Sequence, residues 1–230
     1  MNYEVYRIGF WAGLAAFIST VAFVVVQLLQ LLHILTYPAD AILIYGTSLC
    51  IVIPFILEML ALHYVTPPNR RIWSHAALLF SLMYAVFVTA NYVVQLATVI
   101  PMNLQGKLNE VRILDQSPHS LFWDFDALGY IFMGLSMLIA IPALAKDTCR
   151  QWARRAFLAN ALVTPIIAVV YFAPVFSEKL LWLGSVWGIT APAAMICLAL
   201  TFRKTRIAAM IVYVTMNMLV PMQYPEHICV

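Results

Sequence analysis

Charged side chains are scarce in this sequence, which contains 13 lysines and arginines and 10 aspartates and glutamates among 230 residues. Charged residues make up 10% of the chain and hydrophobic residues 64%, a balance far from that of soluble domains. This composition leaves no room for a separate soluble domain. The net charge of +3 is small and spread over the connections between apolar stretches, so it does not indicate nucleic-acid binding.

Motifs of known catalytic mechanism are also missing. The chain has no HExxH metalloprotease motif, no Gly-x-Ser-Gly element of an intramembrane serine protease and no Walker nucleotide-binding motif. Its five histidines are scattered without the spacing of metal ligands, and its four cysteines form no CxxC pair. We therefore expect neither an enzyme nor a metal site, and the sequence identifies no cofactor.

Long apolar stretches fill most of the chain and alternate with short polar connections. Each stretch has about the 20 residues or more that a helix rising ~1.5 Å per residue needs to cross a bilayer. They are too long and too uniform for the strands of a membrane barrel, so we expect helices. The prediction is an all-α polytopic membrane bundle, one domain over residues 1–230. The six expected spans are roughly 8–35, 41–65, 76–100, 121–145, 156–176 and 181–202.

The basic residues are unevenly distributed between the connections. With six crossings, ten fall on one side: Arg7, Arg70, Arg71, Lys146, Arg150, Arg154, Arg155, Arg203, Lys204 and Arg206. Three fall on the other: Lys107, Arg112 and Lys179. Short cytoplasmic loops carry an excess of lysine and arginine. We therefore expect a cytoplasmic N-terminus and, for a bacterial chain, a location in the inner (plasma) membrane.

Two further segments are apolar but shorter. Residues 207–222 are apolar on all sides and too short to decide between a seventh crossing and a re-entrant or interfacial segment. Residues 101–120 form the one long connection, on the outer side. Leu104, Leu108, Val111 and Leu114 recur there at helical spacing with charges opposite. This pattern predicts a short amphipathic helix, which either caps a cavity or covers an interface.

Polar residues gather in the outer half of the expected spans. Gln27 and Gln30 lie near the outer end of the first span, and Asn91 and Gln95 share a face of the third. In the fourth span, Asp124 and Asp126 are about 200° apart at ~100° per residue, so only one can face inward. We choose Asp126, one turn from Tyr130. The residues of the expected solute-binding site are Gln27, Gln30, Asn91, Gln95, Asp126 and Tyr130.

Glu58 lies deep in the second span with several apolar residues on both sides. A charged carboxylate there would lose its hydration with no basic residue in any span to replace it. Two interpretations remain open: Glu58 is a proton-coupling group, or it is a neutral carboxyl that bonds to a neighbouring helix. The same choice applies to the outer residues, which either bind a solute or ion or only connect helices by hydrogen bonds.

The chain resembles small bacterial membrane proteins of six helices, to which no activity is attached. The resemblance rests on the length, the paired layout of the helices and the acidic residue within Phe55-Ile56-Leu57-Glu58-Met59. Its layout is also similar to that of the membrane subunits of vitamin importers, in architecture alone. The expected partners are the lipid bilayer and either a small solute or another membrane protein. Two functions follow: binding or transport of a small solute or ion, or a non-catalytic subunit or assembly factor.

Overall fold

The computed structural model describes residues 3–144 and 148–219, and this part of the chain is entirely helical. Its long helices are α1 (Tyr3–Leu31), α2 (Ala39–Val65), α3 (Arg71–Val94), α6 (Leu121–Ala140), α7 (Thr148–Phe172) and α9 (Trp187–Leu219). Six stretches are long and apolar enough to cross a membrane. The prediction of an all-α bundle with six spans is confirmed, and the protein is a multi-pass membrane protein.

Short elements connect the long helices. They are η1 (Pro68–Arg70), the π turn η2 (Gln95–Val99), α4 (Ile100–Leu104), α5 (Leu108–Val111), η3 (Arg112–Leu114), η4 (Ile141–Ala143) and α8 (Glu178–Gly184). Ala145, Lys146 and residues 220–222, which belong to predicted segments, lie outside the described residues. The sixth candidate span begins in α8 and runs into α9.

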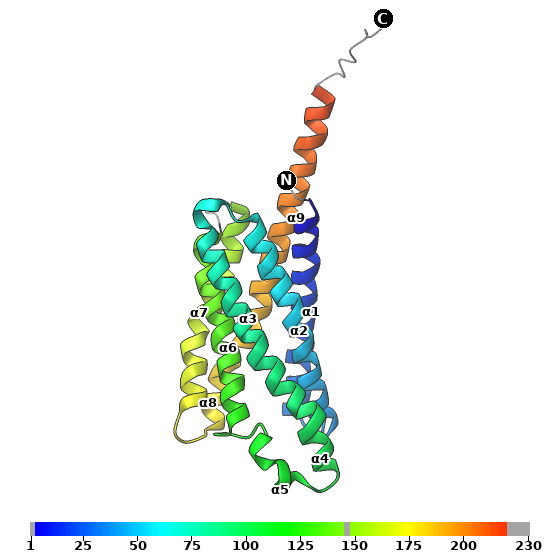
Figure 1. Cartoon of the computed structure of the whole chain (residues 1–230), viewed down its shortest axis with the longest axis vertical. Helices are drawn as coiled ribbons and strands as arrows, with labels where there is room; N and C mark the ends of the chain where they lie inside the picture. The colour runs from blue at the N-terminus through cyan, green and yellow to red at the C-terminus, as the bar shows by residue number, and fades with distance from the viewer. Residues whose placement is uncertain (1–2, 145–147, 220–230) are drawn as a thin grey trace, which may run out of the picture.

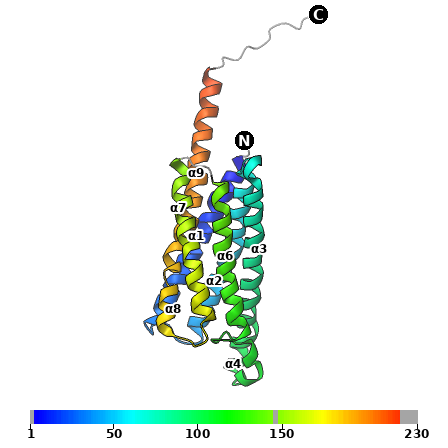
Figure 2. The same cartoon turned by 90° about the vertical axis from the view of Figure 1, so that its left-hand side faces the viewer.

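The six long helices form a closed ring. Each packs against the next in the order α1, α2, α3, α6, α7 and α9, and α9 packs against α1. Short connections make successive helices antiparallel, as Figures 1 and 2 show. Because the ring is closed, side chains from different helices can meet on its axis.

Small residues allow these helices to approach closely. Several alanines are fully buried in the bundle, among them Ala16, Ala77, Ala127, Ala153 and Ala194. Large aliphatic side chains instead cover the outside, a distribution that suits lipid as the surrounding solvent. Small residues therefore pack between the helices together with a core of large apolar side chains such as Phe55, Met133 and Leu198.

The two ends of the bundle differ. Figure 1 shows the start of α1 and the end of α9 at one end, and α4, α5 and α8 at the other. We call the first the basic end, since it carries Arg7, and the second the loop end. Arg154 at the basic end donates to the carbonyl oxygens of Ile141 (3.2 Å) and Leu144 (2.9 Å). A basic side chain near the start of α7 thereby bonds to carbonyls of η4 and of the residue that follows it.

The structure places the first part of segment 207–222 in α9. The helix continues without a turn from the span to Leu219 and extends beyond the bundle (Figures 1 and 2). No glycine or proline lies between Phe202 and Ile207, so nothing in the sequence stops the helix there. Within the described residues this segment does not turn back to form a seventh crossing.

The predicted amphipathic helix of the long connection is instead broken into short pieces. Gly106 adopts a φ of 72° after α4, a conformation that glycine reaches at little cost. The chain then restarts as α5 and η3. The apolar residues that suggested one helix lie on both sides of Gly106. Their spacing fits a single helix, although one helix ends and another begins between them. Of these residues Val111 is buried, whereas Leu104 is 60% exposed.

Candidate functional site

Asp126 is the centre of a buried hydrogen-bonded group near the loop end, which we call the Asp126 site. Its Oδ1 accepts a hydrogen bond from the hydroxyl of Tyr92 at 2.6 Å, and its Oδ2 accepts one from the hydroxyl of Tyr171 at 2.5 Å. Such short bonds are typical of an ionised acceptor. No basic side chain bonds to Asp126 among the described residues. The site therefore holds a carboxyl group whose donors are two tyrosine hydroxyls and the side-chain amide of Gln116.

The ring order of the helices explains this meeting. α6 lies between α3, which carries Tyr92, and α7, which carries Tyr171. α6 starts at a Ser120 cap, whose side-chain oxygen accepts a hydrogen bond from the backbone N–H of Trp123 at 3.1 Å. From this start Asp124 points outward and is exposed, while Asp126 is 4% exposed. The two aspartates thus occupy opposite environments.

Aromatic rings surround the site on the axis of the bundle. The ring of Tyr130 lies 4.8 Å from that of Trp187 and 6.1 Å from that of Tyr171, measured between centroids. Beside them is a cavity of about 10 Å³, with room for about one water molecule. Its lining includes side chains from five of the six long helices: Phe23, Ser48, Tyr84, Tyr92, Tyr130 and Trp187. Tyr92 belongs to both the cavity and the Asp126 site.

Asn91 and Gln95 are buried and bond to the long connection rather than to Asp126. The Nδ2 of Asn91 donates to Oε1 of Gln116 at 2.9 Å. The Nε2 of Gln95 donates to the carbonyl of Leu114 at 2.7 Å, and its Oε1 accepts from the backbone N–H of Gln116 at 3.3 Å. These contacts hold residues 114–116 over the loop end of α3. The long connection, residues 101–120, closes the bundle there, and we call it the loop cover.

A π turn begins at Gln95. Pro101 has no N–H for the carbonyl of Ala97, and its ring would collide with that carbonyl in a regular helix. The backbone hydrogen bonds change to the wider pattern of the π turn Gln95–Val99 just before the proline. Such turns often occur at functional sites. Asn91 and Gln95 are four residues apart and still joined by a regular helical bond, so both face the buried side of α3.

Gln27 and Gln30 do not join the other predicted site residues. Gln27 is exposed, and Nε2 of Gln30 donates to Oδ2 of Asp40 at the start of α2, at 2.8 Å. Residues three apart on a helix differ by about 300° at ~100° per residue, so this stripe moves around α1 instead of staying on one face. The six predicted site residues therefore lie in three places. Gln27 and Gln30 lie near the end of α1, Asn91 and Gln95 contact the loop cover, and Asp126 and Tyr130 lie at the Asp126 site.

Glu58 lies in the other half of the bundle, and its Oε1 has no hydrogen-bond partner among the described residues. The side chain of Glu58 is 1% exposed. The carboxyl group packs against the Cα of Gly13 in α1, in the space that a Cβ would occupy, with Ala199 of α9 beside it. His63, five residues further along α2, lies 3.0 Å from the hydroxyl of Ser74 and not against Glu58. An unpaired buried polar atom of this kind costs about 1–3 kcal/mol.

Sequence reasoning missed three residues of the loop-end group: Tyr92, Tyr171 and Gln116. Tyr92 follows Asn91 directly, and a polar residue beside a predicted site residue was the available signal. Nothing in the sequence distinguishes Tyr171 or Gln116 from other polar residues near a helix end. Their role depends on which helices are neighbours.

The described residues contain no group of three or more histidine, cysteine, aspartate or glutamate side chains that could hold a metal ion. The chain matches no protein-family model, no curated protein and no solved structure. The chemistry of the site therefore has to be inferred from its own geometry.

Proposed function

We propose that this protein carries protons across a membrane, with Asp126 as the proton-binding group near the loop end. The observation that carries the proposal is the Asp126 site itself: a buried carboxyl group, bonded to two tyrosine hydroxyls and to no basic residue, beside a cavity of water size. Tyrosine hydroxyls both donate and accept hydrogen bonds. They can therefore serve either the carboxylate or the protonated carboxyl without a change of partner.

The size of the central cavity favours a proton over a larger solute. About 10 Å³ beside Tyr92 leaves no space for an organic molecule, whose sites typically measure ~300 Å³ or more. A metal cation is also a poor fit, because oxygen-liganded cations such as Ca²⁺ take about six or more ligands. Among the described residues, Asp126 supplies the sole carboxylate of this group, and its hydrogen-bonded neighbours are two hydroxyl donors and the amide of Gln116.

Glu58 is the second carboxyl of the proposed path, toward the basic end. A proton-carrying group needs access to a neutral and a charged form, and a charged group inside a membrane generally marks a functional route. Between the two carboxyls the core is mainly apolar, with Phe23, Ile51 and Phe55 buried there. This layer would prevent free leakage, so transfer would require a change of conformation. In this proposal the basic end is cytoplasmic, which the excess of basic residues there supports.

Proton flux into liposomes tests the proposal. The purified protein is reconstituted with a pH-sensitive dye inside, and a potassium diffusion potential drives proton entry. We expect flux above that of empty liposomes, and its loss in Asp126→Asn. Asp124→Asn is the matched control, because Asp124 is exposed on the same helix. Glu58→Gln is expected to lower the flux strongly. Equal flux in the wild type and in a folded Asp126→Asn protein would refute the proposal.

A second function is favoured by the loop cover. Apart from one bond between the two side chains, the described side-chain bonds of Asn91 and Gln95 are with residues 114–116, which is the arrangement of a structural connection. In this alternative the protein is a non-catalytic subunit or assembly factor, and its polar residues only lock helices together. Wild-type liposomes without flux, from protein that is folded, would support this second function.

A further inference from the structure

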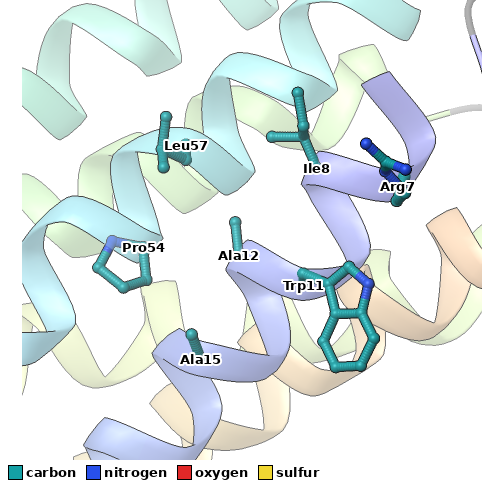
Figure 3. Close-up of a pocket in the computed structure, with 7 residues that line it drawn as sticks. All are labelled: Arg7, Ile8, Trp11, Ala12, Ala15, Pro54 and Leu57. Atoms are coloured by element: carbon teal, nitrogen blue, oxygen red, sulfur yellow. The ribbon is translucent and has the colours of Figure 1, made fainter. Parts of the chain in front are cut away.

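A groove runs along the outside of the bundle between α1 and α2, at the basic end. Its volume is about 300 Å³, and its walls are Ile8, Ala12 and Ala15 of α1 with Pro54 and Leu57 of α2 (Figure 3). The two alanines leave space that larger side chains would fill. Ala15 and Leu57 are exposed, so the groove opens toward the surrounding lipid.

The groove has a charged end. Arg7 lines it one turn before Trp11, nearer the start of α1 (Figure 3). The guanidinium of Arg203 lies over the ring of Phe10 at 5.9 Å, and the rings of Phe10 and Trp11 are 5.2 Å apart. Two arginines and an exposed tryptophan therefore share one level of the bundle. Tryptophan is typical of the membrane interface, where lipid head groups lie.

We propose that this groove binds one anionic phospholipid, with an acyl chain against Ala12 and Ala15 and the phosphate against Arg7. The eight residue steps from Arg7 to Ala15 span ~12 Å along the helix, less than half of a ~30 Å hydrocarbon core. An acyl chain whose head group lies at the charged end of the groove can therefore run along the whole groove. Charge complementarity selects an anionic lipid, because basic residues near the surface attract such lipids.

The ion pair of Arg7 with Glu4 gives the proposal a directional test. Nη2 of Arg7 lies 2.7 Å from Oε2 of Glu4, and both side chains are about half exposed. Such an exposed pair is weak, so a phosphate can compete with it. Removing Glu4 should then strengthen lipid binding, whereas removing Arg7 should weaken it. A purely structural ion pair would predict the same effect from both changes.

Native mass spectrometry of the delipidated protein measures the binding. The protein is incubated with equal amounts of phosphatidylglycerol and phosphatidylcholine with identical acyl chains. We expect the wild type to retain more phosphatidylglycerol. Arg7→Gln should lower the phosphatidylglycerol-to-phosphatidylcholine ratio about fivefold, the effect of one basic residue at an anionic surface. Glu4→Gln should raise the ratio. Arg71→Gln, at an exposed position of α3, is the charge control and should leave it unchanged.

A second substitution tests the groove itself. Ala15→Leu fills it from an exposed position and should reduce retention of both lipids. Ala159→Leu, at an exposed alanine of α7, is the matched control. Circular dichroism verifies that each variant is folded. Equal retention of the two lipids by the wild type overturns the proposal, and so does wild-type retention by both folded Arg7→Gln and folded Ala15→Leu.

Discussion

The loop-end half and the basic-end half of the bundle each bury one carboxyl group, and they treat it differently. At the loop end, Asp126 receives two hydrogen bonds from tyrosines on the neighbouring helices α3 and α7. At the basic end, Glu58 has an oxygen without any partner and lies against the backbone of Gly13. Burial is similar, with 4% of Asp126 and 1% of Glu58 exposed.

The difference shows two ways in which this sequence joins membrane helices. The loop end uses polar side chains, which bond across helices and to the loop cover. The basic end uses small residues: Gly9 meets Ala61 and Phe202, and Gly13 meets Ala199. Small residues spaced four apart permit close backbone approach. A carboxyl group at such a contact has space but no donor, so its presence there calls for a role other than stability.

The largest effect is expected from filling the space beside Glu58. A Cβ at Gly13 would overlap the carboxyl group of Glu58 and approach Ala199. Overpacking typically costs 1–3 kcal/mol, and we expect Gly13→Val to lower the free energy of unfolding by about 3 kcal/mol. Unfolding by SDS in mixed micelles measures this change.

Gly46 of α2 provides the matched control, because nothing lies within 4 Å of a Cβ built there. Gly46→Ala should change the stability by less than ~1 kcal/mol, and in the stabilising direction, since alanine is the better helix former. The double variant Gly13→Val, Glu58→Ala should recover part of the loss. No loss in Gly13→Val would mean that the helices separate easily and that the basic end is not held by close packing.

A smaller effect is expected from removing the carboxyl group of Asp126. Asp126→Ala leaves the hydroxyls of Tyr92 and Tyr171 without their acceptor. Contacts of this kind average ~0.6 kcal/mol in membranes and unpaired buried groups cost more, so we expect a loss of about 2 kcal/mol. The exposed Asp124 is the control, with an expected loss below ~1 kcal/mol for Asp124→Ala.

The triple variant Asp126→Ala, Tyr92→Phe, Tyr171→Phe separates two causes of that loss. Removing the unpaired hydroxyls should restore stability if unsatisfied donors are the cost. No restoration would indicate that lost packing around Asp126 dominates instead. The same SDS titration applies to all of these variants.

The sequence predicted the six spans because length and apolar composition are local properties of the chain. Helical angles showed that only one of Asp124 and Asp126 can face inward, and the one-turn spacing to Tyr130 selected Asp126. The bond to Tyr171 was not predictable, because it depends on α6 lying between α3 and α7. The role of Gln116 depends likewise on how the loop cover folds back, which Gly106 changes by ending a helix. The bond of Gln30 to Asp40 was not predictable, because Asp40 lies beyond a turn that helical periodicity does not describe.

The smallest effect, and the one with the opposite sign, is expected from replacing Glu58 by an apolar residue of similar length. Glu58→Met removes the unpaired oxygen and keeps the contact with Gly13 filled, so stability should rise by about 1 kcal/mol. Glu58→Gln should bring no gain, because it leaves a buried polar group in place. Leu57→Met, at the exposed neighbouring position, is the control for the change of side chain. A loss of stability in Glu58→Met would reveal a bonding partner of Glu58 and would make the two halves of the bundle alike. A gain, together with lost proton flux, would mean that the chain retains Glu58 for transfer and at the expense of stability.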